Sequence, residues 1–123
     1  MNPWLLAAAV NGFLAVAAGA FAAHGLSGRL DAHSMQTFET GARYQMYHAL
    51  ALGIAAASAR GAAAQAAKTA AGFFLAGIVL FSGSLYLLAL TGIRTFAIAT
   101  PFGGVAFLIG WAALAWAATR AWR

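Results

Sequence analysis

Four long apolar stretches fill nearly all of this 123-residue chain and leave it few ways to fold. They cover about residues 4–23, 44–59, 69–90 and 101–118. A helix needs ~20 apolar residues to cross the hydrocarbon core of a bilayer. Because a helix satisfies its own backbone hydrogen bonds, it can do so without exposing unpaired polar groups to lipid. The sequence therefore predicts a single all-α membrane domain, residues 1–123, with four antiparallel transmembrane helices.

The charged residues lie between or beside these stretches. They make up 7% of the chain, whereas a soluble domain carries about a quarter. The net charge of +5 does not indicate nucleic-acid binding, since the basic residues are scattered rather than clustered. They are better interpreted as lipid headgroup contacts and orientation signals. With no cysteine, the chain has no disulfide and no thiolate metal ligand.

The first stretch is predicted to be a retained helix. A cleaved signal peptide is the alternative, because Phe21-Ala22-Ala23 is similar to a cleavage site, but no Lys or Arg precedes the stretch. Asn11 lies in the middle of this span and is expected to hydrogen-bond to another helix. Gly19 and Ala23 are four residues apart, a spacing at which small residues let helices approach closely.

A short amphipathic helix is predicted on the membrane surface before the second span. Asp31 is suited to cap its N-terminus, and Gly41 is a candidate bend where the chain turns inward. Glu39 and Arg43 are four apart, so they can form an interfacial ion pair. The alternative for these two residues is a solvated helix surface.

The second span carries polar side chains in its first two turns. Tyr44, Tyr47 and His48 share one face, with Gln45 at its margin. The two tyrosines alone are typical of the aromatic belt at a membrane surface. His48 lies deeper, where a charged imidazolium is costly, so we expect a neutral, hydrogen-bonded ring. Its candidate partners are hydroxyl groups of the later spans, namely Tyr86, Ser82 or Thr100.

The last two spans supply further polar and small side chains. Ser82 and Tyr86 are four apart and are expected to share a polar contact, whereas Ser84 is expected to point away and bond its own backbone. Thr100 and Pro101 form a helix start, with the threonine as cap. A stripe of small residues that includes Gly103 and Gly110 predicts a packing face.

Because the four spans alternate in direction, one membrane face receives most of the polar side chains. The end of the first span, the start of the second, the end of the third and the start of the fourth meet there. This predicted polar cluster consists of His24, Tyr44, Gln45, His48, Ser82, Tyr86 and Thr100. The opposite face, with both termini and residues 60–68, has four Lys or Arg against three. The positive-inside rule therefore favours cytoplasmic termini.

Several motifs resemble a family of small bacterial inner-membrane proteins, the family of unknown function numbered 423, which has eukaryotic relatives similar to transmembrane protein 256. The resembling segments are residues 19–26, Tyr44-Gln45 with 48–52, residues 81–86, and residues 100–104. Ala22 departs from the family pattern, which has glycine there. The resemblance implies a compact multi-span protein of the bacterial inner membrane and no established activity.

Three functions remain open from the residues. The first is a structural or assembly component that associates with itself or with another membrane protein. The second is binding or transport of a small polar molecule, an ion or a lipid headgroup through the predicted polar cluster. The third is haem or copper binding by His24 and His48, although nothing else in the sequence calls for a cofactor. Catalysis lacks a nucleophile–base pair, so an enzyme is not expected.

Overall fold

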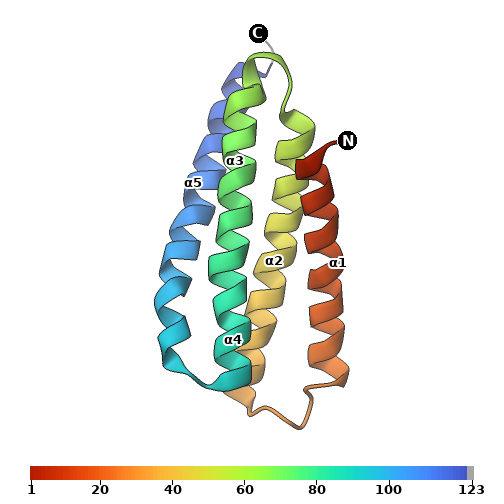
Figure 1. The fold of residues 1–123 in the computed structure, drawn as a ribbon, viewed down its shortest axis with the longest axis vertical. Helices are drawn as coiled ribbons and strands as arrows, with labels where there is room; N and C mark the ends of the chain where they lie inside the picture. The colour runs from red at the N-terminus through yellow and green to blue at the C-terminus, as the bar shows by residue number, and fades with distance from the viewer. Residues whose placement is uncertain (122–123) are drawn as a thin grey trace.

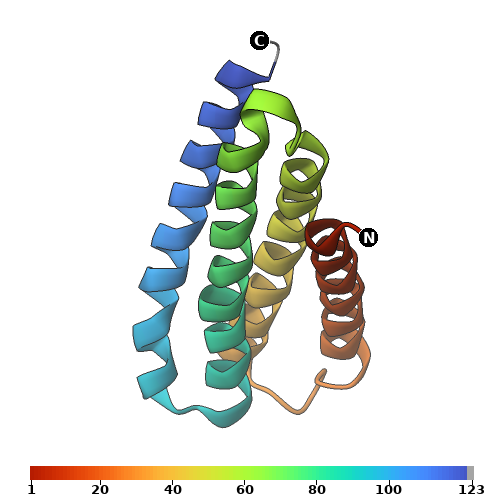
Figure 2. The same ribbon diagram turned by 45° about the horizontal axis from the view of Figure 1, so that its top comes forward.

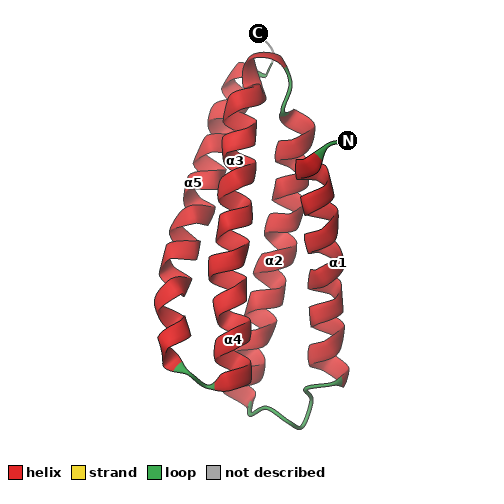
Figure 3. Ribbon diagram, in the orientation of Figure 1, coloured by secondary structure: helices red, strands yellow, loops and turns green. Residues whose placement is uncertain are grey.

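The computed structural model describes residues 1–121, and these residues form a bundle of four helical rods (Figure 1). Successive rods run in opposite directions (Figures 1 and 2), and the start of α1 and the end of α5 lie toward the same end of the bundle (Figure 1). Helices account for nearly all of it (Figure 3). The elements are α1 (Pro3–His24), α2 (Ala32–Ser58), η1 (Gly61–Ala63), α3 (Ala64–Gly77), η2 (Ile78–Ser82), α4 (Gly83–Thr91), η3 (Arg94–Ile98) and α5 (Ala99–Arg120).

Local capping fixes where three of the rods begin or end. The Asn2 side chain accepts a hydrogen bond from the Leu5 N–H at 3.1 Å and caps α1. Asp31 caps α2 as predicted, accepting from the Ser34 N–H at 2.7 Å. This backbone hydrogen bond lowers the pKa of Asp31 below its ordinary value. Gly92 ends α4 with φ of 71°, a left-handed conformation that favours glycine.

The predicted surface helix is not a separate element. Residues 32–58 form one continuous helix, α2, which includes both the amphipathic segment and the second predicted span. Gly41 is therefore not a bend. A Cβ at Gly41 would lie 3.1 Å from Tyr86 Cε1 and 3.3 Å from Leu85 Cβ. Its lack of a side chain lets α4 approach α2 closely, which explains a glycine in the middle of this helix.

Residues 61–91 form one rod that contains a π-helical turn. The turn, η2, joins α3 to α4, and the Gly83 N–H after it donates to the Ile78 carbonyl five residues earlier. A π turn accommodates one extra residue. The side chains that follow are therefore rotated by about 100° from their positions in an uninterrupted α-helix. This rotation changes which residues of α4 face the neighbouring helices.

Three of the rods are long and apolar enough to cross a membrane. They are residues 3–24, 61–91 and 94–120. They contain the first, third and fourth predicted spans. α2 is long but has a more polar first half, which lowers its mean hydropathy. Large apolar side chains are exposed on the outside of the bundle, among them Phe13, Leu50 and Leu108. Such a surface is suited to lipid rather than water.

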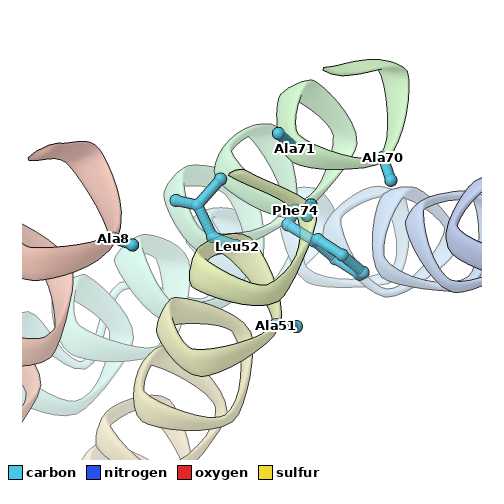
Figure 4. Packing of buried hydrophobic residues seen from close by; sticks show 7 residues of the cluster. Ala8, Ala51, Leu52, Ala70, Ala71 and Phe74 are labelled. Atoms are coloured by element: carbon cyan, nitrogen blue, oxygen red, sulfur yellow. The ribbon is translucent and has the colours of Figure 1, made fainter. Parts of the chain in front are cut away.

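The interior is built from small residues and a few large ones. Phe74 and Leu52 are fully buried among alanines of α1, α2 and α3 (Figure 4). Small side chains let the rods approach closely, which is how helices associate in lipid. The predicted stripe on α5 faces inward, and Gly103 and Gly110 are buried in it. Gly19, also predicted as a packing residue, is exposed on α1, and a Cβ added there would have no neighbouring atom within 4 Å.

Candidate functional site

Apart from Ser82, the buried polar side chains form three separate hydrogen-bonded groups rather than one cluster. In the first, the Gln45 side chain on α2 links α1 to α4. Its Nε2 donates to Asn11 Oδ1 at 3.1 Å, and its Oε1 accepts from the Tyr86 hydroxyl at 2.6 Å. Asn11 in turn donates to the Ala7 carbonyl at 2.8 Å. Asn11 thus makes the kind of interhelical bond expected from its position, and we call this chain the Gln45 network.

The second group centres on His48, whose partner differs from all three that were predicted. The Trp111 indole on α5 donates to His48 Nε2 at 3.1 Å, and Nδ1 lies 2.8 Å from the Tyr44 carbonyl. An indole N–H only donates and a carbonyl only accepts. The ring is therefore neutral with its proton on Nδ1, because a proton on Nε2 would face the indole N–H.

Aromatic rings enclose the His48 imidazole, which is buried. Phe107 stacks on it, with ring centroids 3.5 Å apart and planes within 7°. Phe74 contacts it at 5.7 Å and Trp111 at 6.0 Å between centroids. Tyr44 is stacked at 6.1 Å but is itself partly exposed, as is Tyr47. Within these rings the imidazole has two hydrogen-bond partners, the Trp111 indole and the Tyr44 carbonyl.

The third group joins α4 to α5 through Ser84 and Thr100, whose hydroxyl oxygens are 2.6 Å apart. Ser84 also donates to the Phe81 carbonyl at 2.8 Å. The prediction that Ser84 points away is thus wrong, and the π turn before it explains the changed face. Thr100 is not the helix cap, because η3 leads directly into α5 and Ile98 is the cap position.

Ser82 does not share a contact with Tyr86. Its hydroxyl is buried without a hydrogen-bond partner, while the Tyr86 hydroxyl is used by Gln45. Ser82 is the last residue of the π turn, where the backbone hydrogen-bond pattern differs from that of an α-helix. The expected serine–tyrosine contact is therefore absent: Tyr86 bonds to Gln45, and the Ser82 hydroxyl has no partner.

His24 belongs to none of the buried polar groups. It is the exposed last residue of α1. The end of α1 and the start of α2 are at the same end of the bundle (Figure 1). His48 is sixteen residues into α2, about 24 Å along its axis at 1.5 Å per residue. The two histidines therefore cannot bind one haem or copper, which removes that hypothesis. Residues 1–121 contain no group of three or more metal-ligating side chains.

The predicted ion pair is also absent from the described part of the chain. Arg43 donates to the Thr40 hydroxyl at 3.2 Å instead of pairing with Glu39, and all three residues are at the surface or close to it. An exposed pair of this kind gains little over solvated charges. The alternative interpretation, a solvated helix surface, fits the structure.

The surface of the bundle includes five hollows whose linings contain no residue of the three buried groups. One hollow is lined by sequence neighbours of the Gln45 network, namely Met46 of α2 and residues of α1 that include Gly12 and Phe13. Two others lie toward the ends of the bundle and contain an arginine each, Arg94 and Arg120. Gln45, His48 and Ser84 therefore contact polar partners on other helices, and none of the three lines these hollows.

Sequence reasoning missed Trp111 as a polar partner, because its position indicates only an aromatic residue in the second half of the last span. A signal was available, since Phe107 and Trp111 are four residues apart, next to the small-residue stripe. A helix face that packs inward through glycine and alanine carries its neighbouring aromatic residues to the same interface.

Comparison with known proteins identifies relatives over almost the whole chain. A family model described as "Protein of unknown function (DUF423)" matches residues 18–104. The UPF0382 membrane protein YwdK of Bacillus subtilis is 45% identical over 121 residues, which cover 98% of each chain. The UPF0382 inner membrane protein YgdD of Escherichia coli strain K12 is 47% identical over 117 residues, covering 94% of this chain and 88% of that protein.

A third relative, a UPF0382 membrane protein of Haemophilus influenzae, is 45% identical over 116 residues, which cover 94% of this chain and 92% of that protein. No solved structure matches the chain. The matches carry the names of membrane proteins and no name of an enzyme. By its sequence and its apolar helices, the chain belongs to the DUF423 family of membrane proteins.

Proposed function

We propose that this protein is a structural or assembly component of the bacterial inner membrane that associates with a second copy of itself. One observation carries the proposal: Gln45, His48 and Ser84, three of the four buried polar side chains in the described residues, make hydrogen bonds to other helices. Gln45 is 6% exposed, and both ends of its amide have partners. A binding or transport site needs polar groups that face a space. Here they hold the rods together.

The arrangement of these bonds supports the role of an internal lock. The Gln45 network connects α1, α2 and α4, the His48–Trp111 bond connects α2 and α5, and the Ser84–Thr100 contact connects α4 and α5. Each of these helix pairs thus has a directional contact in addition to apolar packing. In lipid such bonds help to specify which helix faces meet.

The exposed side of α1 is the face we propose for self-association. Of the three apolar rods, α1 has the smallest buried share, because it packs mainly on α2. Gly19 is unused by the bundle. A hollow of about 550 Å³ lies beside Gly12, and the Phe13 ring at its edge is 74% exposed. A second copy of α1 offers complementary shapes, since the aromatic ring of one chain can fill the hollow of the other.

The proposal places four spans across the membrane with both termini in the cytoplasm. The start of α1, η1 and the end of α5 lie toward one end of the bundle (Figure 1). That end carries Arg60, Lys68 and Arg120; Arg123, the fourth basic residue assigned to that side, lies outside the described residues. Arg29 and Arg94 lie toward the opposite end, and Arg43 lies eleven residues into α2, so the positive-inside count of four against three supports this orientation by a narrow margin.

Single-cysteine variants of this cysteine-free chain test both parts of the proposal. In intact cells, Gln36→Cys is expected to react with a membrane-impermeant thiol reagent and Ala62→Cys is not. In isolated membranes, Gly19→Cys is expected to form disulfide-linked dimers. Leu108→Cys, 70% exposed on α5, is the matched control and should stay monomeric.

Three results would contradict the proposal. Labelling of residues 36 and 62 from the same side would exclude the topology. A Gly19→Cys protein that stays uncrosslinked, together with single chains at every concentration in mild detergent, would exclude self-association through α1. Equal crosslinking at residues 19 and 108 would indicate random collision rather than an interface.

A further inference from the structure

A second feature, apart from the buried polar groups, is a hollow at the end of the bundle opposite the termini. It has a volume of about 420 Å³ and lies where the start of α2, the end of α4 and η3 meet. Three polar side chains come from α2, and one comes from the segment after α4, more than fifty residues later. They are His33, Ser34, Thr37 and Arg94, and Leu88 and Ala89 form an apolar wall.

The hollow carries a positive charge that no acidic residue in its lining neutralises. The chain has two acidic residues, Asp31 and Glu39, and neither lines the hollow. The Asp31 carboxylate accepts from the Ser34 N–H at 2.7 Å and is used in capping α2. Arg94 is exposed, so its guanidinium is free to turn toward a ligand. The Ser34 hydroxyl adds a neutral hydrogen-bonding group on the opposite wall, whereas the Thr37 hydroxyl already donates to the His33 carbonyl at 3.0 Å.

This combination matches the chemistry of a phosphate group. A guanidinium presents several N–H donors in a planar fork that fits phosphate oxygens, and hydroxyl and imidazole groups complete such a site. A carboxylate ligand would use the fork equally well, but it would leave the Ser34 hydroxyl and the His33 imidazole of the α2 wall with fewer acceptor oxygens. Phosphate offers more oxygens around one centre.

The surroundings of the hollow indicate what the phosphate is attached to. Ile93 and Ile98, on either side of Arg94, are 52% and 64% exposed, and Leu90 is 49% exposed. Apolar side chains at this level contact acyl chains, while the arginine reaches the headgroup. We propose that this hollow binds the phosphate of an anionic glycerophospholipid, with His33, Ser34 and Arg94 around the phosphate and the acyl chains along α4.

The hollow at the other end of the bundle is a weaker candidate. It is lined by Gln65, Thr69 and Arg120, but the Arg120 guanidinium lies 5.6 Å from the centre of the Trp116 ring and is held by that contact. The lipid site is independent of the assembly role proposed above. It uses neither the exposed face of α1 nor the buried polar groups.

Lipid titration of the full-length protein in mild detergent, followed by native mass spectrometry, tests this inference. The probes are dioctanoyl phosphatidylglycerol, dioctanoylglycerol without a phosphate, and glycerol phosphate without acyl chains. Wild-type protein is expected to bind the phospholipid and not dioctanoylglycerol. Arg94→Gln is expected to weaken phospholipid binding about tenfold or more, because a charge-assisted contact to phosphate is lost.

Arg29→Gln is the matched control, since Arg29 is exposed at the same end of the bundle and does not line the hollow. It removes the same charge and should leave the affinity within about twofold, as expected for an exposed charge. Equal weakening by both variants, or none by Arg94→Gln, would overturn the site. If glycerol phosphate binds with the same dependence on Arg94, the site holds and its ligand is a free phosphate ester. If only the phospholipid binds, the ligand is a membrane lipid.

Discussion

Gly103→Ala is expected to destabilise the bundle by about 3 kcal/mol, the upper end of the usual cost of overpacking. A Cβ at Gly103 would lie 2.7 Å from Phe81 Cβ and 2.8 Å from Phe81 Cα, and closer still to the Phe81 backbone nitrogen. Two of these three atoms are backbone, so no side-chain rotation relieves the overlap. α5 would have to move away from the π turn.

Gly104→Ala provides a control one residue away. A Cβ at Gly104 has nothing within 4 Å. Since alanine is favoured over glycine in a helix by about 1 kcal/mol, this variant should be neutral or slightly stabilising. The measurement is the thermal unfolding midpoint of each purified variant in the same mild detergent. Equal midpoints for the two variants would show that α5 and the π turn are not in close contact.

Trp111→Phe is expected to destabilise the protein by about 1–3 kcal/mol, the usual cost of leaving a buried polar group without its partner. Phenylalanine keeps an aromatic ring beside Phe74, whose centroid is 5.1 Å from that of Trp111. It removes the indole N–H that donates to His48 Nε2. The loss of stability therefore measures mainly the missing hydrogen bond to His48 rather than a change in aromatic packing.

Trp116→Phe is the matched control, because Trp116 is 59% exposed on the same helix. Its effect should stay within about 0.5 kcal/mol, as for other surface substitutions. His48→Leu should resemble Trp111→Phe, since it leaves the indole N–H without an acceptor. His48→Gln retains a side-chain acceptor and should recover part of the loss. A Trp111→Phe protein as stable as wild type would mean that His48 does not depend on the indole.

The overall architecture followed from the sequence because its causes are local. Apolar length predicts the rods, and the Asp31 cap and the Gly92 terminus fix their ends through neighbouring atoms. The inward stripe on α5 was also predictable, because small residues at helical spacing have few other uses in lipid. Asn11 was expected to bond another helix for the same reason: a lone amide inside a span needs a partner.

The composition of the buried polar groups did not follow, because it depends on exact helix faces. The π turn at 78–82 rotates the residues after it, which brings Ser84 to Thr100 and leaves Ser82 without a partner. No residue type in residues 78–82 predicts a π turn. The alternating direction of the spans predicted that the polar residues meet at one end of the bundle. In the structure they lie at different distances from that end along their helices, so they form separate groups. His24, at a helix end, thus lies far from His48.

The continuity of α2 was a further point that spacing left ambiguous. Gly41 has two common uses in a helix, as a bend or as a point of close approach. The choice depends on whether a neighbouring helix is present at that height. Here Tyr86 and Leu85 of α4 occupy the space beside Gly41. Only the tertiary packing therefore decides between one long helix and two.

Pairing among the buried polar side chains is tested most directly by a double-mutant cycle on Gln45 and Tyr86. The variants are Gln45→Leu, Tyr86→Phe and the double substitution, each measured for its free energy of unfolding in mild detergent. Since the Tyr86 hydroxyl donates to Gln45 Oε1 at 2.6 Å, we predict a coupling energy of about 1–2 kcal/mol. Additive effects, within about 0.3 kcal/mol, would contradict this pairing.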